Sequence, residues 1–238
     1  MWLYQPKTGY RSGLDPVLLA AAVPVKPGES VLDLGCGAGA AALCLLARAP
    51  SARAVGLEIQ PAYHALALMN AAGNPFDFEP VLGDVADGAR ALMGRNFDHV
   101  IANPPFYRAG AHTRADDPGR QMALGEELPL AEWIATAAKR LKPRGYLHMI
   151  QRPDRLPDML AGCAGRLGAL ELLPIAPREG RAPELVILRA RKDGRAAFRL
   201  HAPLVLHLED RSLGNGKNYR PDIAAVQRDA APLPWPKG

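Results

Sequence analysis

The chain has 238 residues, 48% of them hydrophobic and 22% charged, a composition that excludes a disordered or fibrous protein and predicts one globular domain over residues 1–238. Lysine and arginine outnumber aspartate and glutamate by 29 to 24, so the net charge of +5 permits a polyanionic partner without requiring one. No apolar run reaches about 18 residues and no secretory leader is visible, so we expect a cytoplasmic protein with no membrane partner. The spacings of Cys36, Cys44 and Cys163 predict reduced thiols and no metal site.

Predicted strands and helices alternate through the first 150 residues. Strands are predicted at 31–34, 52–58, 78–84, 97–102 and 145–151. Helices are predicted at 40–49, 61–72 and 129–145, and a weaker one at 155–170. The later segments 170–176, 183–192 and 198–209 have the composition of antiparallel strands. The pattern predicts an α/β fold, with a Rossmann-like, doubly wound, mostly parallel seven-stranded sheet and an antiparallel C-terminal edge.

Two stretches fall outside this alternation. Residues 107–128 are polar and too long for an ordinary connection, so we expect a lid or binding loop there. Residues 212–238 are rich in glycine, asparagine and proline, which predicts an irregular tail.

A glycine-rich turn follows the first predicted strand. In VLDLGCGAG, Gly35, Gly37 and Gly39 allow a sharp turn and a close approach of a ligand to the backbone. The spacing also fits the loose dinucleotide fingerprint, which alone is a weak signal. Asp33 argues against a dinucleotide, because a carboxylate just before the turn repels a pyrophosphate and attracts a cationic amine or sulfonium.

Two more acids end the next two predicted strands. Glu58 can accept hydrogen bonds from the hydroxyl groups of a ribose. Asp84 can accept one from the exocyclic amine of an adenine, and Val85 or Ala86 can offer a backbone amide to the ring. These positions fit an adenosyl group with a positive, non-phosphorylated tail. We therefore expect S-adenosylmethionine as the cofactor, S-adenosylhomocysteine as its product, and no metal.

The sequence NPPF follows the fourth predicted strand. An amine conjugated to an aromatic ring or an acyl group is a poor nucleophile, because its lone pair is delocalised. Acceptors for both of its N–H groups let the nitrogen pyramidalise and direct the lone pair at the sulfonium methyl group. Asn103 can provide one acceptor through its side chain, and Pro104 the other through its carbonyl, held by the fixed φ of Pro104 and Pro105. Phe106 can stack on a planar substrate.

These motifs resemble those of known enzymes. LDLGCGAG is similar to the first motif of class I methyltransferases, and GLEI is similar to the end of their second strand. NPPF resembles the fourth motif of enzymes that methylate exocyclic amines of nucleic-acid bases or the side-chain amide of glutamine. The resemblance implies an N-methyltransferase and disfavours aliphatic carbon and hydroxyl groups as targets.

Over about residues 3–210 the chain resembles the bacterial family of tRNA(Val) adenine-37 N6-methyltransferases, through QPKTGYRSGLDPVLLAAAV, EIQ, NPPF and HAPLVLHLED. The resemblance implies adenine N6 in tRNA as the target and a cofactor-proximal segment at 1–28. It also implies cofactor contacts by Ile59 and by Arg11 or Asp15.

One part of the N-terminal segment departs from this family. Gly13 and Leu14 stand where the family pattern has a bulky aromatic and a polar or β-branched residue. The role of the segment therefore stays open between contact with the cofactor and tethering of the first helix.

RNA would have to bind to the surface of the domain itself. Candidate phosphate contacts, with a solvated face as the alternative, are Lys139, Arg140, Lys142, Arg144, Arg189, Arg191, Lys192, Arg195 and Arg199.

Three other functions stay open at this point. They are glutamine N5-methylation of a translation factor, guanine N2-methylation of ribosomal RNA, and binding of RNA and an adenosyl ligand without turnover. The first resembles a family that usually carries an extra N-terminal helical domain, and the second often comes from a chain of about twice this length. An intact NPPF argues against the third. The oligomeric state is not predicted.

Overall fold

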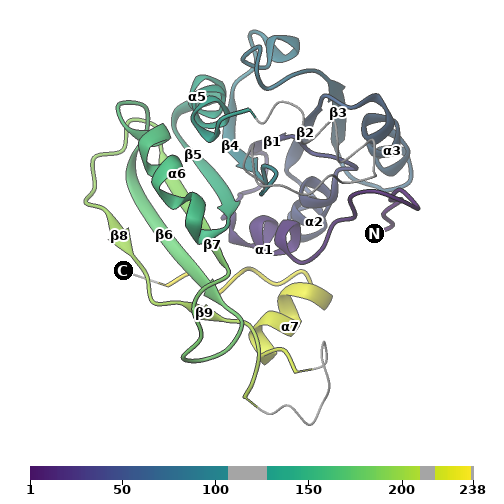
Figure 1. Cartoon of the computed structure of the whole chain (residues 1–238). Coiled ribbons are helices and arrows are strands. Elements are labelled where there is room, and N and C mark those ends of the chain that lie inside the picture. Colours follow the sequence, from purple (N-terminus) through teal and green to yellow (C-terminus); the bar gives the residue numbers. More distant parts are fainter. Residues whose placement is uncertain (107–127, 210–217, 237–238) are drawn as a thin grey trace.

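The computed structural model describes residues 1–106, 128–209 and 218–236. Residues 107–127, which hold nearly all of the expected lid, lie outside the described ranges, as do 210–217 and 237–238. The described residues form a nine-stranded mixed sheet with helices on both of its faces (Figure 1). The predicted α/β class is confirmed.

Five parallel strands form the half of the sheet that carries the predicted motifs. In the spatial order β3-β2-β1-β4-β5, they are β1 (Ser30–Leu34), β2 (Arg53–Glu58), β3 (Phe78–Leu82), β4 (Phe97–Ala102) and β5 (Leu141–Gln151). The register places Leu34 beside Leu57 on one side and Ala102 on the other. The residues that follow these strands therefore meet at one edge of the sheet, where the strand order switches direction.

The antiparallel edge is confirmed. β7 (Leu185–Arg191) pairs antiparallel with β5, and β6 (Gly168–Ala176) pairs antiparallel with β7. With these, the sheet has seven strands of five or more residues, which is the number expected for the sheet. Two strands of two residues each, β8 (Arg199–Leu200) and β9 (Leu204–Val205), extend the sheet beside β6. Pro203, which has no amide hydrogen, lies between them and interrupts the predicted strand 198–209.

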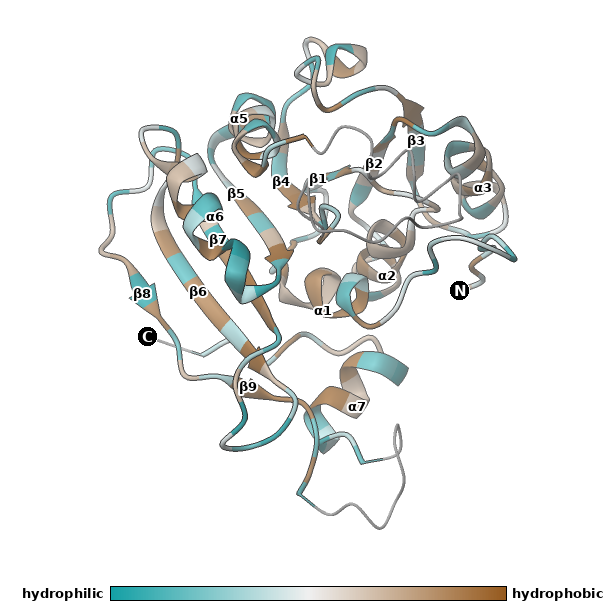
Figure 2. Cartoon of the chain, viewed as in Figure 1, coloured by the Kyte–Doolittle hydropathy of each residue, from teal (hydrophilic) through white to brown (hydrophobic). Residues whose placement is uncertain are grey.

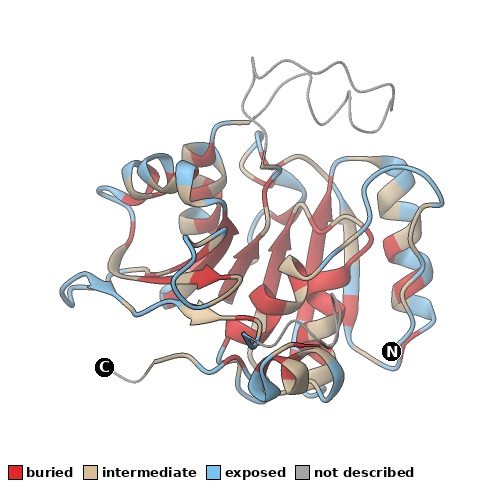
Figure 3. Cartoon of the chain, turned by 60° about the horizontal axis from the view of Figure 1, so that its bottom comes forward, coloured by how far each residue is buried: buried red, intermediate tan, exposed pale blue. Residues whose placement is uncertain are grey.

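Helices bury both faces of the sheet. The cluster on one face includes residues of α1 (Asp15–Ala22), α2 (Ala40–Arg48), α3 (Pro61–Ala72) and α7 (Pro221–Arg228). The other cluster includes α5 (Leu130–Arg140) and α6 (Leu156–Cys163). Val31 and Leu32 of β1 point into opposite clusters, as expected for a strand between two helical layers. The central strands β1, β2 and β4 are accordingly mostly apolar (Figure 2) and buried (Figure 3), whereas β3 and the first half of β6 are only partly buried. Single turns of 3-10 helix lie at η1 (Arg90–Leu92) and η2 (Pro153–Arg155).

Part of the expected irregular tail is helical, which corrects that expectation for α7. Pro221 lies in the first turn, where its missing amide hydrogen costs nothing. Ile223 and Val226, three positions apart, are buried in the cluster that contains α1. An isolated helix of eight residues is not stable in water, so the packing of its apolar side chains determines the helical conformation of α7.

The helix predicted at 129–145 ends at Arg140, and β5 begins at the next residue. Pro143 accounts for the difference, because proline disfavours helical conformation in the residue before it and has no amide hydrogen to donate.

Two buried histidines lie on neighbouring strands of the sheet. The ring centroids of His99 in β4 and His148 in β5 are 5.5 Å apart, and Nε2 of His99 lies 3.1 Å from a carboxylate oxygen of Glu29. Neither ring nitrogen of His148 has a hydrogen-bond partner among the described residues. Burial, with His99 and Arg189 nearby, lowers the pKa of His148 well below its ordinary value. His148 is therefore neutral in the folded chain.

Replacing His148 by leucine should flatten the acid limb of the stability curve. Below pH 6.5 the unfolded wild-type chain binds a proton that the folded chain does not. Wild-type stability is therefore lost as the pH falls, by up to about 1.4 kcal/mol per pH unit for this group. Urea unfolding between pH 7 and pH 5 measures the slope. Equal slopes for both proteins would contradict the prediction.

Candidate functional site

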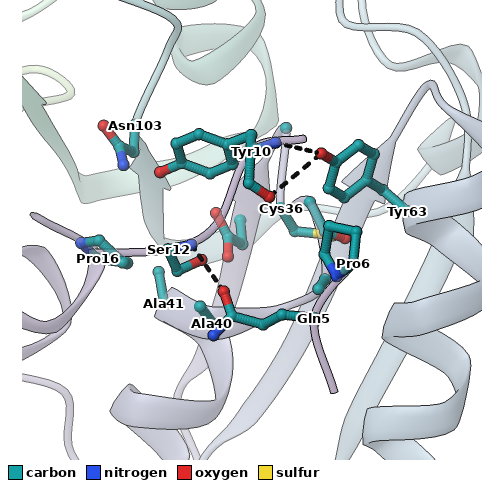
Figure 4. Close-up of a pocket in the computed structure, with 14 residues that line it drawn as sticks. Gln5, Pro6, Tyr10, Ser12, Pro16, Cys36, Ala40, Ala41, Tyr63 and Asn103 are labelled. Carbon is teal, nitrogen blue, oxygen red and sulfur yellow. Dashed lines mark hydrogen bonds between the residues drawn. The ribbon is translucent and has the colours of Figure 1, made fainter. Parts of the chain in front are cut away.

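A cavity lies at the carboxyl edge of β1 and β4, with the N-terminal segment on one side (Figure 4). It is lined by Gln5, Pro6, Tyr10, Ser12, Pro16, Asp33, Gly35, Cys36, Gly37, Ala38, Ala40, Ala41, Tyr63 and Asn103. Four of the predicted site residues, Asp33, Gly35, Gly37 and Asn103, are thus brought to one cavity.

The glycine turn places its three glycines in the left-handed region, with φ of +66° at Gly35, +56° at Gly37 and +87° at Gly39. A Cβ atom would lie 2.6 Å from the Trp133 ring at Gly35 and 2.5 Å from the Phe78 ring at Gly39, but at Gly37 it would have no neighbour within 4 Å. Internal packing therefore requires glycine at Gly35 and Gly39, and only Gly37 leaves space for the expected close approach of a ligand.

Replacing Gly39 by alanine should destabilise the fold by about 2 kcal/mol, because left-handed strain adds to a clash with the Phe78 ring. Gly37→Ala is the matched control. It carries the same kind of strain without a clash and should cost about 1 kcal/mol. Chemical unfolding of both variants measures the difference, and equal losses would show that Phe78 moves aside.

Asp33 is almost completely buried at the end of β1 and lines the cavity. One of its carboxylate oxygens accepts a hydrogen bond of 3.2 Å from the amide of Ala42, in the first turn of α2. Burial raises the pKa of Asp33 to about 8, partly opposed by this bond and reinforced by the charge of Glu58. A cationic ligand beside this buried carboxyl group would stabilise its ionised form, and the ionised group would in turn strengthen the binding of that ligand.

Glu58 holds the backbone of the site in place. Its two carboxylate oxygens accept hydrogen bonds of 2.8 Å from the amides of Gly37 and Gln60. Burial raises the pKa of Glu58 in spite of these bonds. Glu58 is not among the cavity-lining residues. Contact of these oxygens with a ribose stays a prediction.

The other predicted adenosine contacts lie beyond this cavity. β3 ends at Leu82, two residues earlier than predicted, and Asp84 caps its own turn by accepting a hydrogen bond of 2.8 Å from the amide of Ala86. Val85 is buried and its carbonyl accepts a hydrogen bond from the Thr136 hydroxyl at 3.1 Å. Ile59 is exposed, and none of these residues lines the cavity. Their roles at the cofactor site stay predictions.

The Asn103 side chain directly follows β4 and faces Tyr10 across the cavity (Figure 4). Its carboxamide lies close to the Tyr10 hydroxyl. Burial, followed by the charge of Asp15, raises the pKa of Tyr10, so its hydroxyl stays protonated near neutral pH. Asn103 therefore presents its polar group to the cavity and not to the core.

The residues after Asn103 differ in exposure. Pro104 is buried, Pro105 is exposed and Phe106 is half-buried. The Pro104 carbonyl accepts a hydrogen bond of 2.7 Å from Nε2 of Gln151 at the end of β5. None of the three lines the cavity, so their roles as acceptor, rigid hinge and stacking partner stay predictions.

The N-terminal segment is anchored by its backbone. The Tyr63 hydroxyl accepts a hydrogen bond from the Tyr10 amide at 3.0 Å and donates one to the Tyr10 carbonyl at 3.2 Å. The Ser12 amide donates to the Gln5 side chain at 2.7 Å. Arg11 is exposed and is not among the lining residues. The sequence analysis did not predict that Tyr63 lines the cavity. Its position in the first turn of a helix that follows the strand ending at Glu58 could have indicated this.

Several expected phosphate contacts have structural partners instead. Arg140 is buried and donates to the carbonyls of Gly88 and Leu92, and Lys192 donates to two carbonyls of α5 and β5. Lys142 pairs with Asp98 at 2.8 Å. These residues lie near the amino end of β5, away from Gln151 at its carboxyl end, which weakens the prediction of a phosphate-binding face there.

Neither a metal site nor a membrane span is found within the described ranges. No group of histidine, cysteine or acidic side chains there has the arrangement of a metal site. No helix there is long and apolar enough to cross a membrane. The three cysteines form no disulfide, and burial raises the pKa of Cys36, which lines the cavity.

Comparison with known proteins assigns this chain to a family. The family described as methyltransferase small domain matches residues 14–167. A tRNA1(Val) (adenine(37)-N6)-methyltransferase of Porphyromonas gingivalis is 37% identical over 74% of this chain and 72% of that protein. The protein of the same name from Actinobacillus succinogenes is 30% identical over 76% of each chain.

Solved structures agree with this assignment. A protein of Agrobacterium tumefaciens described as a predicted O-methyltransferase superposes with a TM-score of 0.74 at 27% identity, covering 91% of this chain and 97% of that one. A SAM-dependent O-methyltransferase of Thermotoga maritima shares the fold, with a TM-score of 0.56 at 17% identity over 80% of this chain and 69% of that one. With its strand order, its glycine turn and the family match over 14–167, this chain belongs to the methyltransferase small domain family and is a methyltransferase.

Proposed function

We propose that this protein transfers the methyl group of S-adenosylmethionine to N6 of an adenine in tRNA. The observation that carries the proposal is the position of Asn103, whose carboxamide faces the same cavity as the buried carboxyl group of Asp33. The Asn103 carboxamide oxygen suits one of the two hydrogens of an amine, and the Asp33 carboxyl group suits the positive end of the cofactor.

The residues present fit this cofactor. S-adenosylmethionine, when bound, supplies a methyl group on a positively charged sulfur. Asp33 would hold the cationic methionine end, and Gly37 leaves space for the ligand beside the backbone. Glu58 and Asp84 follow the turn towards β3, so the adenosyl group would lie along that edge of the sheet.

The geometry of the NPPF loop supports an amine as the acceptor. Asn103 and the Pro104 carbonyl offer two hydrogen-bond acceptors, and an exocyclic NH2 group has two hydrogens to donate. A hydroxyl group has only one hydrogen, which argues against the O-methylation named for the structural neighbours. Both acceptors would hold the nitrogen with its lone pair free for the methyl carbon that the bound cofactor would supply. The electrons of the S–CH3 bond would leave with S-adenosylhomocysteine, and the surplus proton of the amine would pass to solvent.

The choice of adenine in tRNA rests on the relatives named above, which are described as acting on adenine 37 of tRNA1(Val). The net charge of +5 is compatible with a polyanionic substrate. The same acceptor pair would also serve the amide of glutamine, which is the second candidate.

Nucleoside and peptide mass analysis after incubation with isotope-labelled S-adenosylmethionine tests the proposal. The substrates are total tRNA, ribosomal RNA and translation release factors, all from cells without this protein. Labelled N6-methyladenosine in tRNA is the expected product. Labelled N2-methylguanosine or N5-methylglutamine in its place would reassign the substrate, and absence of label in all three would reject the function.

A further inference from the structure

Gln151 is fully buried at the last position of β5, directly beside the NPPF loop. Its side-chain nitrogen donates to the Pro104 carbonyl oxygen at 2.7 Å and lies 3.4 Å from the Pro105 carbonyl oxygen. It is not among the residues that line the cavity. Gln151 is thus a buried carboxamide whose nitrogen contacts two successive carbonyl groups of the NPPF loop. This arrangement requires an explanation.

The surroundings of Gln151 determine which way its amide points. Pro104 and Pro105 have no amide hydrogens, so these two residues present only acceptors to it. The nitrogen must therefore face the loop. The oxygen accepts a hydrogen bond of 3.3 Å from the amide of Arg152, which supports the same orientation.

Pro104 and Pro105 also cannot donate hydrogen bonds from their own backbone nitrogens. In an ordinary turn, backbone amides fix the direction of neighbouring carbonyls. Here that task falls to a side chain, and among the described residues the Gln151 amide is the donor recorded for the buried Pro104 carbonyl. A carbonyl oxygen has two lone pairs, and the bond to Gln151 uses one of them. The other is left for a hydrogen of the substrate.

We propose that Gln151 is a positioning residue for methyl transfer. It fixes the direction of the Pro104 carbonyl so that this oxygen accepts the second N–H of the target amine. The inference rests on the proposed function. Because Gln151 acts through Pro104 and stays outside the cavity, its loss should lower kcat while binding of the cofactor is retained.

Gln151→Met tests this, since methionine has a similar length and no donor. We expect kcat for tRNA methylation to fall by about 10- to 100-fold, with the KM for tRNA and the Kd for S-adenosylmethionine each within about twofold of wild type. Gln151→Asn is the second variant. It keeps a polar amide but withdraws the donor by roughly 1.5 Å, and should show the same split between kcat and binding. Ile150→Val is the matched control, because it trims the buried core at the same strand end without touching the loop, so it should lower the melting temperature and leave kcat unchanged.

The possible results distinguish the positioning role of Gln151 from the proposed methylation of adenine. If wild-type protein methylates adenine and both Gln151 variants keep kcat within twofold, the positioning role is wrong and the function stands. Parallel losses of kcat and cofactor affinity in the folded variants would also overturn it, because they would indicate general disruption of the site. If wild-type protein methylates no exocyclic amine, the function fails and the role of Gln151 fails with it.

Discussion

Asn103→Ala should raise the activation free energy of methyl transfer by about 2–4 kcal/mol, which corresponds to a fall in kcat of roughly 30- to 1000-fold. The variant loses one of the two acceptors that hold the target amine in its reactive geometry. The side chain faces the cavity and the preceding strand ends at Ala102, so its truncation should leave the fold intact. Single-turnover methylation with saturating cofactor and tRNA measures the effect directly.

Tyr10→Phe is the matched control for that variant. It removes the hydroxyl that faces the Asn103 carboxamide in the cavity but leaves the carboxamide acceptor in place. Its kcat should stay within about threefold of wild type. Calorimetry should give wild-type affinity for S-adenosylmethionine in both proteins. Unchanged single-turnover rates for Asn103→Ala would exclude the acceptor role.

Asp33→Asn should weaken the binding of S-adenosylmethionine by about 10- to 100-fold at pH 8.5 and remove most of its pH dependence. Burial raises the pKa of Asp33 to about 8 in the protein alone, so below that pH the carboxyl group must lose its proton to meet a cation. Wild-type affinity should therefore rise as the pH increases from 6 to 8, by up to about tenfold per unit, and then level off. Isothermal titration calorimetry in buffers of different ionisation enthalpy measures both the affinity and the released proton.

The same substitution should stabilise the protein alone at high pH. The raised pKa means that the folded chain retains a proton that the unfolded chain releases above its ordinary value of 3.8. Wild-type stability is therefore lost as the pH rises from about 4 to about 8, and the Asp33→Asn variant has no such loss. Affinity and stability should thus change in opposite directions at pH 8. Reduced stability of the variant at that pH would show that the bond to the Ala42 amide outweighs the cost of burying the charge.

Local sequence patterns predict those parts of the site that lie next to strand ends. Asp33 and Asn103 could be placed because Asp33 is the penultimate residue of one apolar strand and Asn103 directly follows another, and parallel strands bring such positions together. The same reasoning overextended β3 to Asp84, since a Gly-Asp pair at a strand end does not show where pairing stops.

Residues that act through tertiary contacts could not be placed this way. Gln151 has a function only because β5 lies beside β4, and Tyr63 only because the N-terminal segment runs past α3. For the basic residues the sequence predicted a functional role where the structure shows structural partners. Charge along the sequence suggested a phosphate-binding face, but Arg140 and Lys192 satisfy carbonyl groups that the fold leaves without partners. The helix α7 likewise depends on the apolar surface that receives it.

Trp133 lies directly behind the glycine turn, with its ring close to the position a Cβ of Gly35 would take. An indole in that position gives the protein an intrinsic fluorescent probe of the cofactor turn. The other two tryptophans differ in surroundings, since Trp2 is 77% exposed and Trp235 stacks on the Arg189 guanidinium at 3.8 Å. Emission that shifts on ligand addition in the wild-type protein, but not in Trp133→Phe, would therefore report movement of this turn without any label.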